Sequence, residues 1–416
     1  MFAVVPAQPL RLDNVVQRYD WGSPEAIPGL LGVKPDGDPW AELWLGGHES
    51  APSRVIDPAT GTSGASLDLP TLIRREPTAM LGQRVTDEFG PRLPYLLKVL
   101  AAGRALSLQV HPLPHQAREG FNRENAAGIP LDSPLRSFHD EQHKPEMVIA
   151  LSQFEALAGF RTPRAILSVL TGLDGDLVSA VIAQLRLARS DASLRSAFRL
   201  LLDARGKAAT SGDIERTVAS AERLVAADAE HANAYQTVID LSQQHPGDPG
   251  AIASLLLNRV SLAPGESIFI PAGEVHAYLD GLGIEVMASS DNVLRAGLTH
   301  KHVDEAALVR CTSFTPKLPV IPRIYRVGSR WRATIYRAPT AEFAITLADV
   351  DATESAPLPP QGPRIVMCLD GMVTLRAAAE AWRPMGLAQG ESAFLPHEAG
   401  SVIAAGDGRL VCAWVP

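Results

Sequence analysis

The sequence predicts a mainly β protein with a helical insertion, in which one β-structural unit occurs twice. The strongest observation is a repeat, because residues 265–271 read GESIFIP and residues 390–396 read GESAFLP. A second observation is that short apolar runs separated by turn residues fill residues 1–160, as they do in β structure. A third is that apolar residues recur at intervals of three and four within residues 164–257, which is the spacing of amphipathic helices.

The first segment, residues 1–160, is expected to form short strands separated by turns. Its clearest strand is the apolar run at residues 93–100, which contains one lysine, Lys98. A second strand is expected at residues 105–111 and a third from Glu146 onwards, where Met147, Val148 and Ile149 follow. The sequence therefore predicts an all-β unit before the helical region.

The helical insertion is expected to occupy residues 161–257. Thr162 followed by Pro163 is typical of a helix start, with a capping hydroxyl and a proline at the first helical position. Residues 247–250 read GDPG, which interrupts the helical spacing before a last short helix. The insertion therefore divides one β domain into two parts.

The β pattern returns after the insertion and continues to the end of the chain. Residues 258–316 are expected to complete the first β domain, and a proline-rich link at residues 315–322 leads into a second one. This second domain, residues 317–416, contains the second copy of the repeat. The sequence therefore predicts two β domains of related structure.

Composition and charge restrict the classes of partner. Of 416 residues, 46% are hydrophobic and 20% are charged, and the net charge of -8 argues against nucleic acid as a partner. No segment approaches the roughly 20 apolar residues of a membrane span, and residues 1–10 lack the pattern of a signal peptide. Three cysteines without a Cys-x-x-Cys pattern fit buried free thiols in a reducing compartment. We therefore expect a cytoplasmic monomer that binds no nucleic acid and no membrane.

The first copy of the repeat carries a histidine that the second copy lacks. His276 stands five residues after Pro271, whereas Ser401 stands five residues after Pro396. The spacing of Gly265, Pro271, Gly273 and His276 resembles the second sequence motif of the cupin superfamily. This resemblance implies two cupin-type jelly-roll β-barrels, with a metal site in the first barrel and a structural role for the second.

Candidate partners of His276 occur upstream. Gln109 and His111 are two residues apart in an expected strand, so their side chains share one face. Glu146 begins another strand, and one carboxylate, two imidazoles and one amide oxygen suit a divalent ion of the zinc type. The alternatives are a structural role for either histidine and an exposed strand-end position for Glu146.

Other histidines lie near these motifs. We interpret them as surface groups or as hydrogen-bond partners of the ligands, rather than as ligands themselves. They are His115, His139, His143, His300 and His302.

Taken together, these motifs resemble type I mannose-6-phosphate isomerase. The matching segments are residues 40–46 (WAELWLG), 106–112 (LSLQVHP), 143–146 (HKPE), 271–278 (PAGEVHAY) and 288–299 (ASSDNVLRAGLT). The resemblance implies a zinc-dependent enzyme that interconverts mannose 6-phosphate and fructose 6-phosphate.

The resemblance also implies roles for individual residues. It implies one zinc ion per chain and an active-site arginine at Arg295, with the ion held by Gln109, His111, Glu146 and His276. The chain departs from the family after Pro112, where the family often has Asp-Lys and this sequence has Leu113 and Pro114. No lysine role is therefore transferred to that position.

An aldose–ketose isomerase needs a base that moves a proton between carbons 1 and 2 through an enediolate. Glu285 is our candidate, because it lies among apolar residues whose burial would raise its pKa. The alternative is a structurally paired strand glutamate. Asp291 is a competing carboxylate, which could instead orient Arg295 or another group.

The sugar phosphate needs cations and hydrogen-bond donors. Arg295 and Lys144 are our catalytic cations, and Lys98 and Ser107 are candidate substrate-binding residues. Tyr278 and Asp291 complete the substrate-binding set, and Trp21 could line the pocket. Lys98 could equally be a strand lysine that reaches solvent, and the aromatic residues could belong to the core.

Two other functions compete with the isomerase. A cupin metal oxygenase is disfavoured because such sites usually hold iron with two histidines and one carboxylate, which leaves Gln109 unexplained. A non-catalytic sugar-binding cupin would leave Glu285 and Arg295 without a chemical task.

Overall fold

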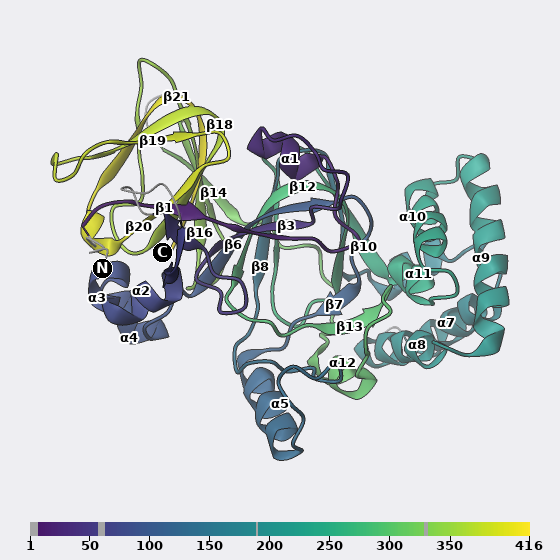
Figure 1. The fold of residues 1–416 in the computed structure, drawn as a ribbon. Coiled ribbons are helices and arrows are strands. Elements are labelled where there is room, and N and C mark those ends of the chain that lie inside the picture. Colours follow the sequence, from purple (N-terminus) through teal and green to yellow (C-terminus); the bar gives the residue numbers. More distant parts are fainter. Residues whose placement is uncertain (1–6, 57–62, 189, 328–331) are drawn as a thin grey trace.

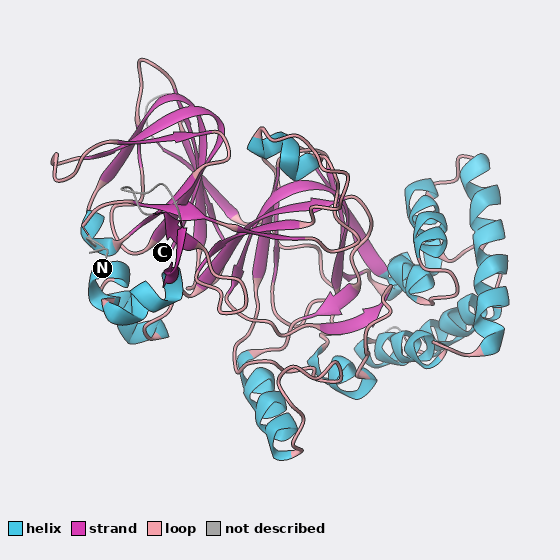
Figure 2. Cartoon of the chain, in the orientation of Figure 1, coloured by secondary structure: helices cyan, strands magenta, loops and turns pink. Residues whose placement is uncertain are grey.

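The computed structural model describes residues 7–56, 63–188, 190–327 and 332–416. Residues 1–6, part of the segment that lacks a signal-peptide pattern, lie outside the described residues. Within the described chain, two large antiparallel sheets form the centre and one side of the molecule, and a group of helices forms the other side (Figures 1 and 2). The prediction of a mainly β protein with a helical insertion is confirmed.

The first sheet contains ten strands in the described residues and is organised around one long strand, β12. Residues 276–280 of β12 pair with β9 and, at His276, with β7, whereas residues 281–288 pair with β6 and β8. β12 therefore joins the strands β7 and β9 to the strands β6 and β8 within one sheet. The strands of this sheet are β2 (Val15–Gln17), β3 (Glu42–Gly46), β6 (Tyr95–Ala102), β7 (Leu108–Val110), β8 (Glu146–Ala150), β9 (Phe154–Phe160), β10 (Leu257–Leu262), β11 (Ser267–Ile270), β12 (His276–Ala288) and β13 (Leu294–Gly297).

The second sheet contains eleven strands in the described residues and combines both ends of the chain. β1 lies between β4 and β20, so the first strand of the chain pairs with one of the last. The strands of this sheet are β1 (Leu10–Asp13), β4 (Arg54–Ile56), β5 (Ser63–Asp68), β14 (Arg323–Val327), β15 (Ala333–Arg337), β16 (Ala344–Val350), β17 (Ala356–Pro357), β18 (Arg364–Ala377), β19 (Met385–Ala388), β20 (Ser392–Leu395) and β21 (Val402–Trp414).

The expectation that residues 1–160 are all β is wrong, because five helices interrupt the strands in this segment. Pro70, Pro77 and Pro114 stand in the first turns of α2, α3 and α5, where proline is favoured. Asp68 caps α2 by accepting a hydrogen bond from Thr71 N at 2.8 Å. The helices are α1 (Ala26–Leu31), α2 (Leu69–Arg75), α3 (Pro77–Leu81), α4 (Gln83–Phe89) and α5 (Pro114–Ala126).

The helical insertion begins and breaks where the sequence predicts. Thr162 Oγ1 accepts a hydrogen bond from Ala165 N at 3.3 Å, and α6 starts at Pro163. α10 ends at Gln244, and the short helix α11 begins at Gly250, the last residue of the predicted break. The elements are α6 (Pro163–Val169), α7 (Asp176–Leu187), α8 (Asp191–Asp203), α9 (Ala208–Ala226), α10 (Ala232–Gln244), α11 (Gly250–Ala253) and the 3-10 helix η1 (Ser254–Leu256).

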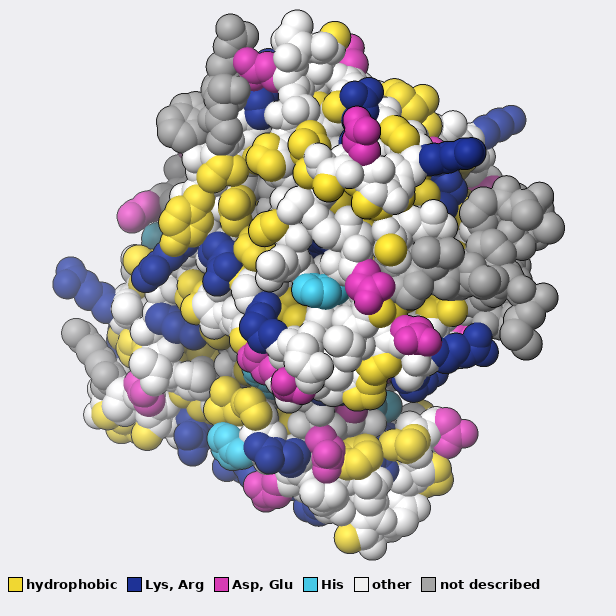
Figure 3. Space-filling view, turned by 90° about the vertical axis from the view of Figure 1, so that its left-hand side faces the viewer, with side chains coloured by type: hydrophobic (Ala, Val, Ile, Leu, Met, Phe, Trp, Pro, Cys, Tyr) yellow, Lys and Arg dark blue, Asp and Glu magenta, His cyan; other side chains and the backbone are white. Residues whose placement is uncertain are grey.

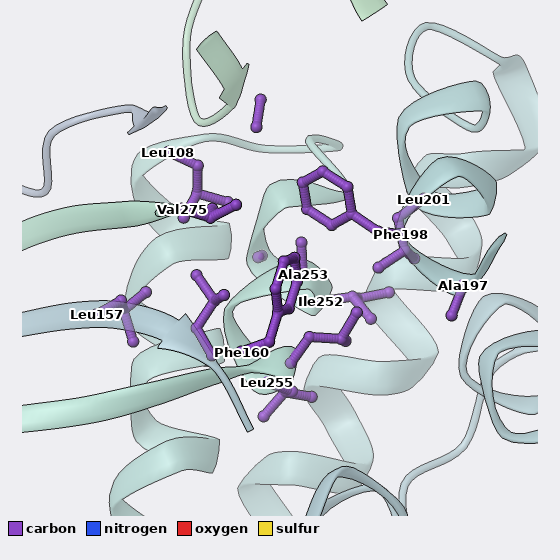
Figure 4. Close-up of a cluster of buried hydrophobic side chains, with 14 of the residues drawn as sticks. Leu108, Leu157, Phe160, Ala197, Phe198, Leu201, Ile252, Ala253, Leu255 and Val275 are labelled. Carbon is purple, nitrogen blue, oxygen red and sulfur yellow. The ribbon is translucent and has the colours of Figure 1, made fainter. Parts of the chain in front are cut away.

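A shared hydrophobic core joins the insertion to the first sheet (Figure 4). The ring of Phe160 on β9 lies 5.4 Å from the ring of Phe198 on α8, and both side chains are fully buried. Leu108 of β7 and Ile252 of α11 belong to the same cluster. Since burial of each such side chain contributes about 1.5–3 kcal/mol, the insertion is firmly attached to the strands that carry the site.

The two copies of the repeat form the same turn and strand. Gly265 (φ 87°) and Gly390 (φ 84°) adopt the left-handed conformation that favours glycine, and each precedes a four-residue strand. In each copy the following glutamate accepts a hydrogen bond from the backbone N–H three residues earlier, at 2.9 Å for Glu266 and 2.8 Å for Glu391. The repeat in the sequence is therefore a repeat in the structure.

Several smaller expectations can also be compared with the structure. The strand expected at residues 105–111 is shorter, because β7 covers only Leu108–Val110. All three cysteines are buried and free, as predicted. No helix in the described residues is long and apolar enough to cross a membrane. Basic and acidic side chains are interspersed over the face of the molecule that Figure 3 shows.

Candidate metal centre and active site

Three buried residues that lie far apart in the sequence converge at the centre of the first sheet. Glu146 is the first residue of β8, His276 is the first residue of β12, and His111 directly follows β7. One potential ligand atom from each residue lies within 4.8 Å of the others. The exposed fraction of each side chain is at most 4%, so none of them reaches bulk water.

The hydrogen bonds of the two histidines fix their tautomers. His111 Nδ1 lies 2.7 Å from the carbonyl oxygen of Asn292, and His276 Nδ1 lies 2.9 Å from that of Glu274. A carbonyl oxygen can only accept a hydrogen bond, so each Nδ1 carries the proton and donates. Each Nε2 therefore presents a lone pair to the interior, as in histidines that bind metal ions.

These lone pairs point at a carboxylate. His111 Nε2 and His276 Nε2 each lie 3.3 Å from an oxygen of Glu146. Within the described residues, both nitrogens and Glu146 Oε2 lack a hydrogen-bond partner. Buried acceptors this close repel one another unless a cation lies between them. The donor set therefore fits a divalent metal ion. Burial lowers the pKa of His111 to about 4, which keeps its imidazole neutral. At His276 the effect of burial is outweighed by Glu146, whose carboxylate favours a proton on Nε2 through hydrogen bonding and charge and so raises the pKa. A metal ion and a proton therefore compete for Nε2 of His276.

Gln109, the predicted amide ligand, lies beside this cluster. In the β pairing it is opposite His276 on one side and opposite Arg295 on the other. Its side chain lines the same cavity as Glu146. The strand register thus places the amide next to the imidazole of His276 and near the predicted active-site arginine.

A second buried cluster surrounds Lys98. Antiparallel pairing places Lys98 of β6 opposite Glu285 of β12 and opposite Trp44 of β3. Lys98 Nζ lies 3.0 Å from Glu285 Oε2 and 3.2 Å from Glu42 Oε1, and Trp44 Nε1 donates to Glu42 Oε2 at 2.7 Å. The cluster therefore contains one more buried carboxylate than buried cations.

The environment of Glu285 alters its pKa. Burial raises the pKa of this carboxyl group, the charge of Lys98 opposes that effect, and Glu146 and Glu42 add to it. The result is a pKa above the usual value for glutamate. A carboxylate with a raised pKa in a cavity is well suited to exchange protons near neutral pH.

The two clusters belong to one cavity of about 680 Å³. His111 and His276 are buried behind its wall, and the other predicted site residues line it. These lining residues are Lys98, Ser107, Gln109, Lys144, Glu146, Tyr278, Glu285, Asp291 and Arg295. The structure therefore brings together all of the residues that the sequence singled out.

The predicted polar residues are buried to different extents. Lys144 is buried, with Nζ 3.6 Å from Glu146 Oε1. Tyr278 is also buried, and burial, followed by the charge of Glu285, raises the pKa of its hydroxyl. Asp291 is 46% exposed, and its Oδ1 lies 3.4 Å from His48 Nε2. It therefore lies at the rim, whereas Glu285 is in the interior.

The remaining histidines occupy varied positions. His139 and His300 line the cavity, whereas His115 and His302 are exposed. His143 Nε2 lies 2.5 Å from Glu342 Oε1, which precedes β16 of the second sheet. The interpretation as surface or supporting groups agrees with the positions of His115, His143 and His302, whereas His139 and His300 lie where they can meet a bound substrate.

Some lining residues carried a signal that the sequence interpretation left unused. Glu42 and Trp44 are two residues apart, which places both on one face of a strand. Between the lining residues Asp291 and Val293, Asn292 is itself fully buried, and its side-chain amide hydrogen-bonds the backbone at residues 139, 140 and 142. By contrast, no sequence pattern indicates that Arg104, His245 and Lys301 line the mouth of this cavity.

Comparison with known proteins gives one consistent match. The model of the family "Phosphomannose isomerase type I, catalytic domain" matches residues 10–163. The chain is 38% identical to mannose-6-phosphate isomerase of Salmonella typhimurium over 96% of its own length and 98% of that protein.

Solved structures agree with this match. A variant of phosphomannose isomerase from Salmonella typhimurium superposes with a TM-score of 0.86 at 35% identity, covering 98% of this chain and 99% of the other. A zinc-bound structure of mannose 6-phosphate isomerase superposes with a TM-score of 0.85 at 36% identity, with the same coverage.

Proposed function

This chain belongs to the type I phosphomannose isomerase family, and we propose that it is a zinc-dependent enzyme that interconverts mannose 6-phosphate and fructose 6-phosphate. The observation that carries the proposal is the convergence of two imidazole lone pairs on the Glu146 carboxylate, in a cavity that also holds a buried candidate base. The metal and the substrate are those named for relatives of nearly full-length similarity.

We propose that one zinc ion is held by Gln109, His111, Glu146 and His276. The tautomers of both histidines and the missing donors at Glu146 support this ligand set. When bound, zinc supplies Lewis-acid chemistry that polarises a carbonyl group and stabilises a developing oxyanion. Asn292 and Glu274 contribute their backbone carbonyls, which hold the imidazoles in the orientation needed for binding.

Glu285 is the proposed base that transfers the proton between carbons 2 and 1 of the open-chain sugar, through an enediolate. Its carboxylate lines the cavity and is shielded from water, so a proton that it accepts is retained for return. Lys98, at 3.0 Å, opposes the effect of burial on the pKa of this carboxylate and so limits its rise. Lys98 also lines the cavity, where its ammonium group can donate a hydrogen bond to a sugar oxygen.

The phosphate is proposed to bind at the mouth of the cavity, away from the buried carboxylates. Arg295 lies there with Arg104 and Lys301. Burial lowers the pKa of both Arg295 and Lys301, and the charge of Arg295 lowers that of Lys301 further. An anion between these cations would relieve their mutual repulsion. Lys144 and Ser107 are proposed to bind the sugar hydroxyls. Tyr278 lies at the cavity wall and Asp291 at its rim.

We propose that residues 1–160 and 258–316 form one catalytic cupin-type jelly-roll barrel, except for β1, β4 and β5, which pair in the second sheet. Residues 161–257 are proposed to form a helical domain that packs on this barrel through a shared core. Residues 317–416 are proposed to form a second cupin-like domain without a metal ion. The common turn of the two repeats supports this division. We also propose that the enzyme acts as a monomer in the cytoplasm.

Incubation with mannose 6-phosphate tests the proposal. The zinc-loaded protein is expected to form fructose 6-phosphate, to lose this activity after chelation and to regain it when zinc is restored. Absence of fructose 6-phosphate from a sample shown to contain one zinc per chain would reject the isomerase. Turnover that persists in a demonstrably metal-free sample would reject the role of zinc.

A further inference from the structure

The helical insertion reaches the mouth of the cavity through the end of α10. His245 directly follows this helix and lines the cavity, with its ring 6.2 Å from that of His300 on the opposite chain segment. Gln244, the last residue of α10, accepts hydrogen bonds from Ala105 N at 2.9 Å and from Arg104 Nη2 at 3.4 Å. One helix end therefore supplies a lining residue and also orients Arg104.

The insertion also holds the turn at residues 297–301 that carries His300 and Lys301. Asp248 Oδ2 accepts a hydrogen bond from Leu298 N at 2.9 Å and lies 3.8 Å from Arg205 Nε. Arg205 in turn donates through Nη2 to the carbonyl oxygen of Thr299. Both charged residues belong to the insertion, and both bind the backbone of this turn.

The turn needs such support because its backbone is strained. Leu298 has φ 55°, in the left-handed region that a bulky side chain rarely occupies, and its side chain is buried. Gly250 and Gly297 pack so closely beside Asp248 that a Cβ on Gly250 would lie 2.9 Å from Asp248 Oδ1. The geometry at Leu298 is therefore determined by its neighbours in the insertion.

The groups collected at the mouth are mainly cationic or able to donate hydrogen bonds. Arg104, Arg295 and Lys301 come from the first sheet and its loops, and His245 comes from the insertion. Asp20 also lines this end and offsets part of the positive charge. A phosphate dianion at this end would meet donors from the first sheet and from the insertion.

We propose that the helical insertion completes the phosphate end of the cavity. His245 contacts the phosphate group, and Asp248 is a positioning residue that holds residues 297–301 so that Lys301 and His300 face the same anion. This inference rests on the proposed function and extends it to a part of the chain that carries none of the proposed zinc ligands or proton-transfer residues.

Three variants of the zinc-loaded enzyme test the inference: His245→Gln, Asp248→Ala and the conservative Asp248→Asn. The first two are expected to raise KM for mannose 6-phosphate and the inhibition constant of inorganic phosphate by about tenfold to hundredfold. kcat and zinc content should change little. Asp248→Asn keeps an oxygen acceptor for Leu298 N and should restore part of the loss. Asp240→Ala, which removes an exposed carboxylate from α10, is the control and should behave as the wild type.

The outcomes separate this inference from the proposed function. Titration of the wild type and the variants with inorganic phosphate by calorimetry reports the anion site even if mannose 6-phosphate is not isomerised. Unchanged KM and unchanged phosphate binding in both His245→Gln and Asp248→Ala would overturn the inference. A fall in kcat that accompanies loss of zinc, with KM unchanged, would also overturn it, because that pattern indicates a general structural role.

Discussion

Arg364 occupies, in the second copy of the repeated structure, the strand position that Glu146 occupies in the first. Ile270 of β11 pairs with Glu146, and the corresponding Leu395 of β20 pairs with Arg364. Arg364 is fully buried and donates to the carbonyl oxygens of Pro359, Gly400 and Pro396 at 2.7–2.9 Å. The second copy thus has a positively charged side chain, Arg364, at the position where the first copy has the carboxylate of Glu146. Since a guanidinium repels metal ions, this supports a metal-free second domain.

Arg364→Met is expected to destabilise the protein without affecting the metal centre. The substitution leaves three buried carbonyl groups without their donors, which costs about 3 kcal/mol or more in the free energy of unfolding. Urea denaturation measures this change, and zinc content checks the metal centre. Arg376→Met, an exposed arginine on the same strand, is the control. A loss no greater than in the control would show that the three hydrogen bonds contribute little.

His276→Ala is expected to abolish zinc binding and isomerase activity together. The variant loses one of the two lone pairs directed at Glu146 and leaves that carboxylate buried with fewer partners. Zinc content by atomic absorption and turnover of mannose 6-phosphate are the measurements. The exposed His302→Ala should keep both properties. Stoichiometric zinc in His276→Ala would mean that the proposed ligand set is wrong.

Glu285→Gln is expected to retain zinc but to lose turnover by about 10²- to 10⁴-fold, the usual contribution of a general base. The amide keeps the shape of the side chain and cannot accept the proton. Removal of deuterium from carbon 2 of mannose 6-phosphate labelled there, followed by NMR during turnover, measures the proton-transfer step directly. Removal at the wild-type rate in this variant would exclude Glu285 and leave Asp291 as the competing carboxylate.

Lys98→Met is expected to shift the pH profile of kcat/KM. The pKa of Glu285 is already raised by burial, and the positive charge of Lys98 limits that rise. Removal of the charge raises the pKa further, and a base is active only when ionised, so the acidic limb must move to higher pH. The relative loss of activity is therefore largest at low pH. A limb at the wild-type position would show that Glu285 does not control it; the exposed Lys34→Met provides the control.

The sequence predicted best those features that depend on neighbouring residues. The capping of α6 by Thr162 and the turn at Gly265 are local, and both are found as expected. The helices in the first 160 residues were missed because a proline in a first helical turn resembles a proline in a loop. Local strand spacing suggested His111, Glu146 and His276 as ligands of one metal site, and the family resemblance reinforced that set.

Features that depend on strand register could not be predicted. Lys98 and Glu285 each stand out as a charge in an apolar run, but only the pairing of β6 with β12 places them opposite each other. The same holds for His245, whose position at the cavity follows from packing of the insertion on the sheet. Such contacts join residues that are far apart in the sequence. Whether the long intervening segment closes in this way depends on the whole fold.

The pairing of β1 with β20 has a consequence for synthesis of the protein. Arg11 Nη2 donates to the carbonyl oxygen of Gly386, 375 residues later, so β1 leaves the ribosome long before its partner exists. Until β20 emerges, β1 can pair with β4 on one side only, and an open strand edge favours association between chains. A fragment that ends before Ser392 is therefore expected to aggregate, which sedimentation would reveal; a monodisperse fragment would contradict this. Synthesis of β20 then acts as a quality check, since only a chain that includes β20 can protect both edges of β1.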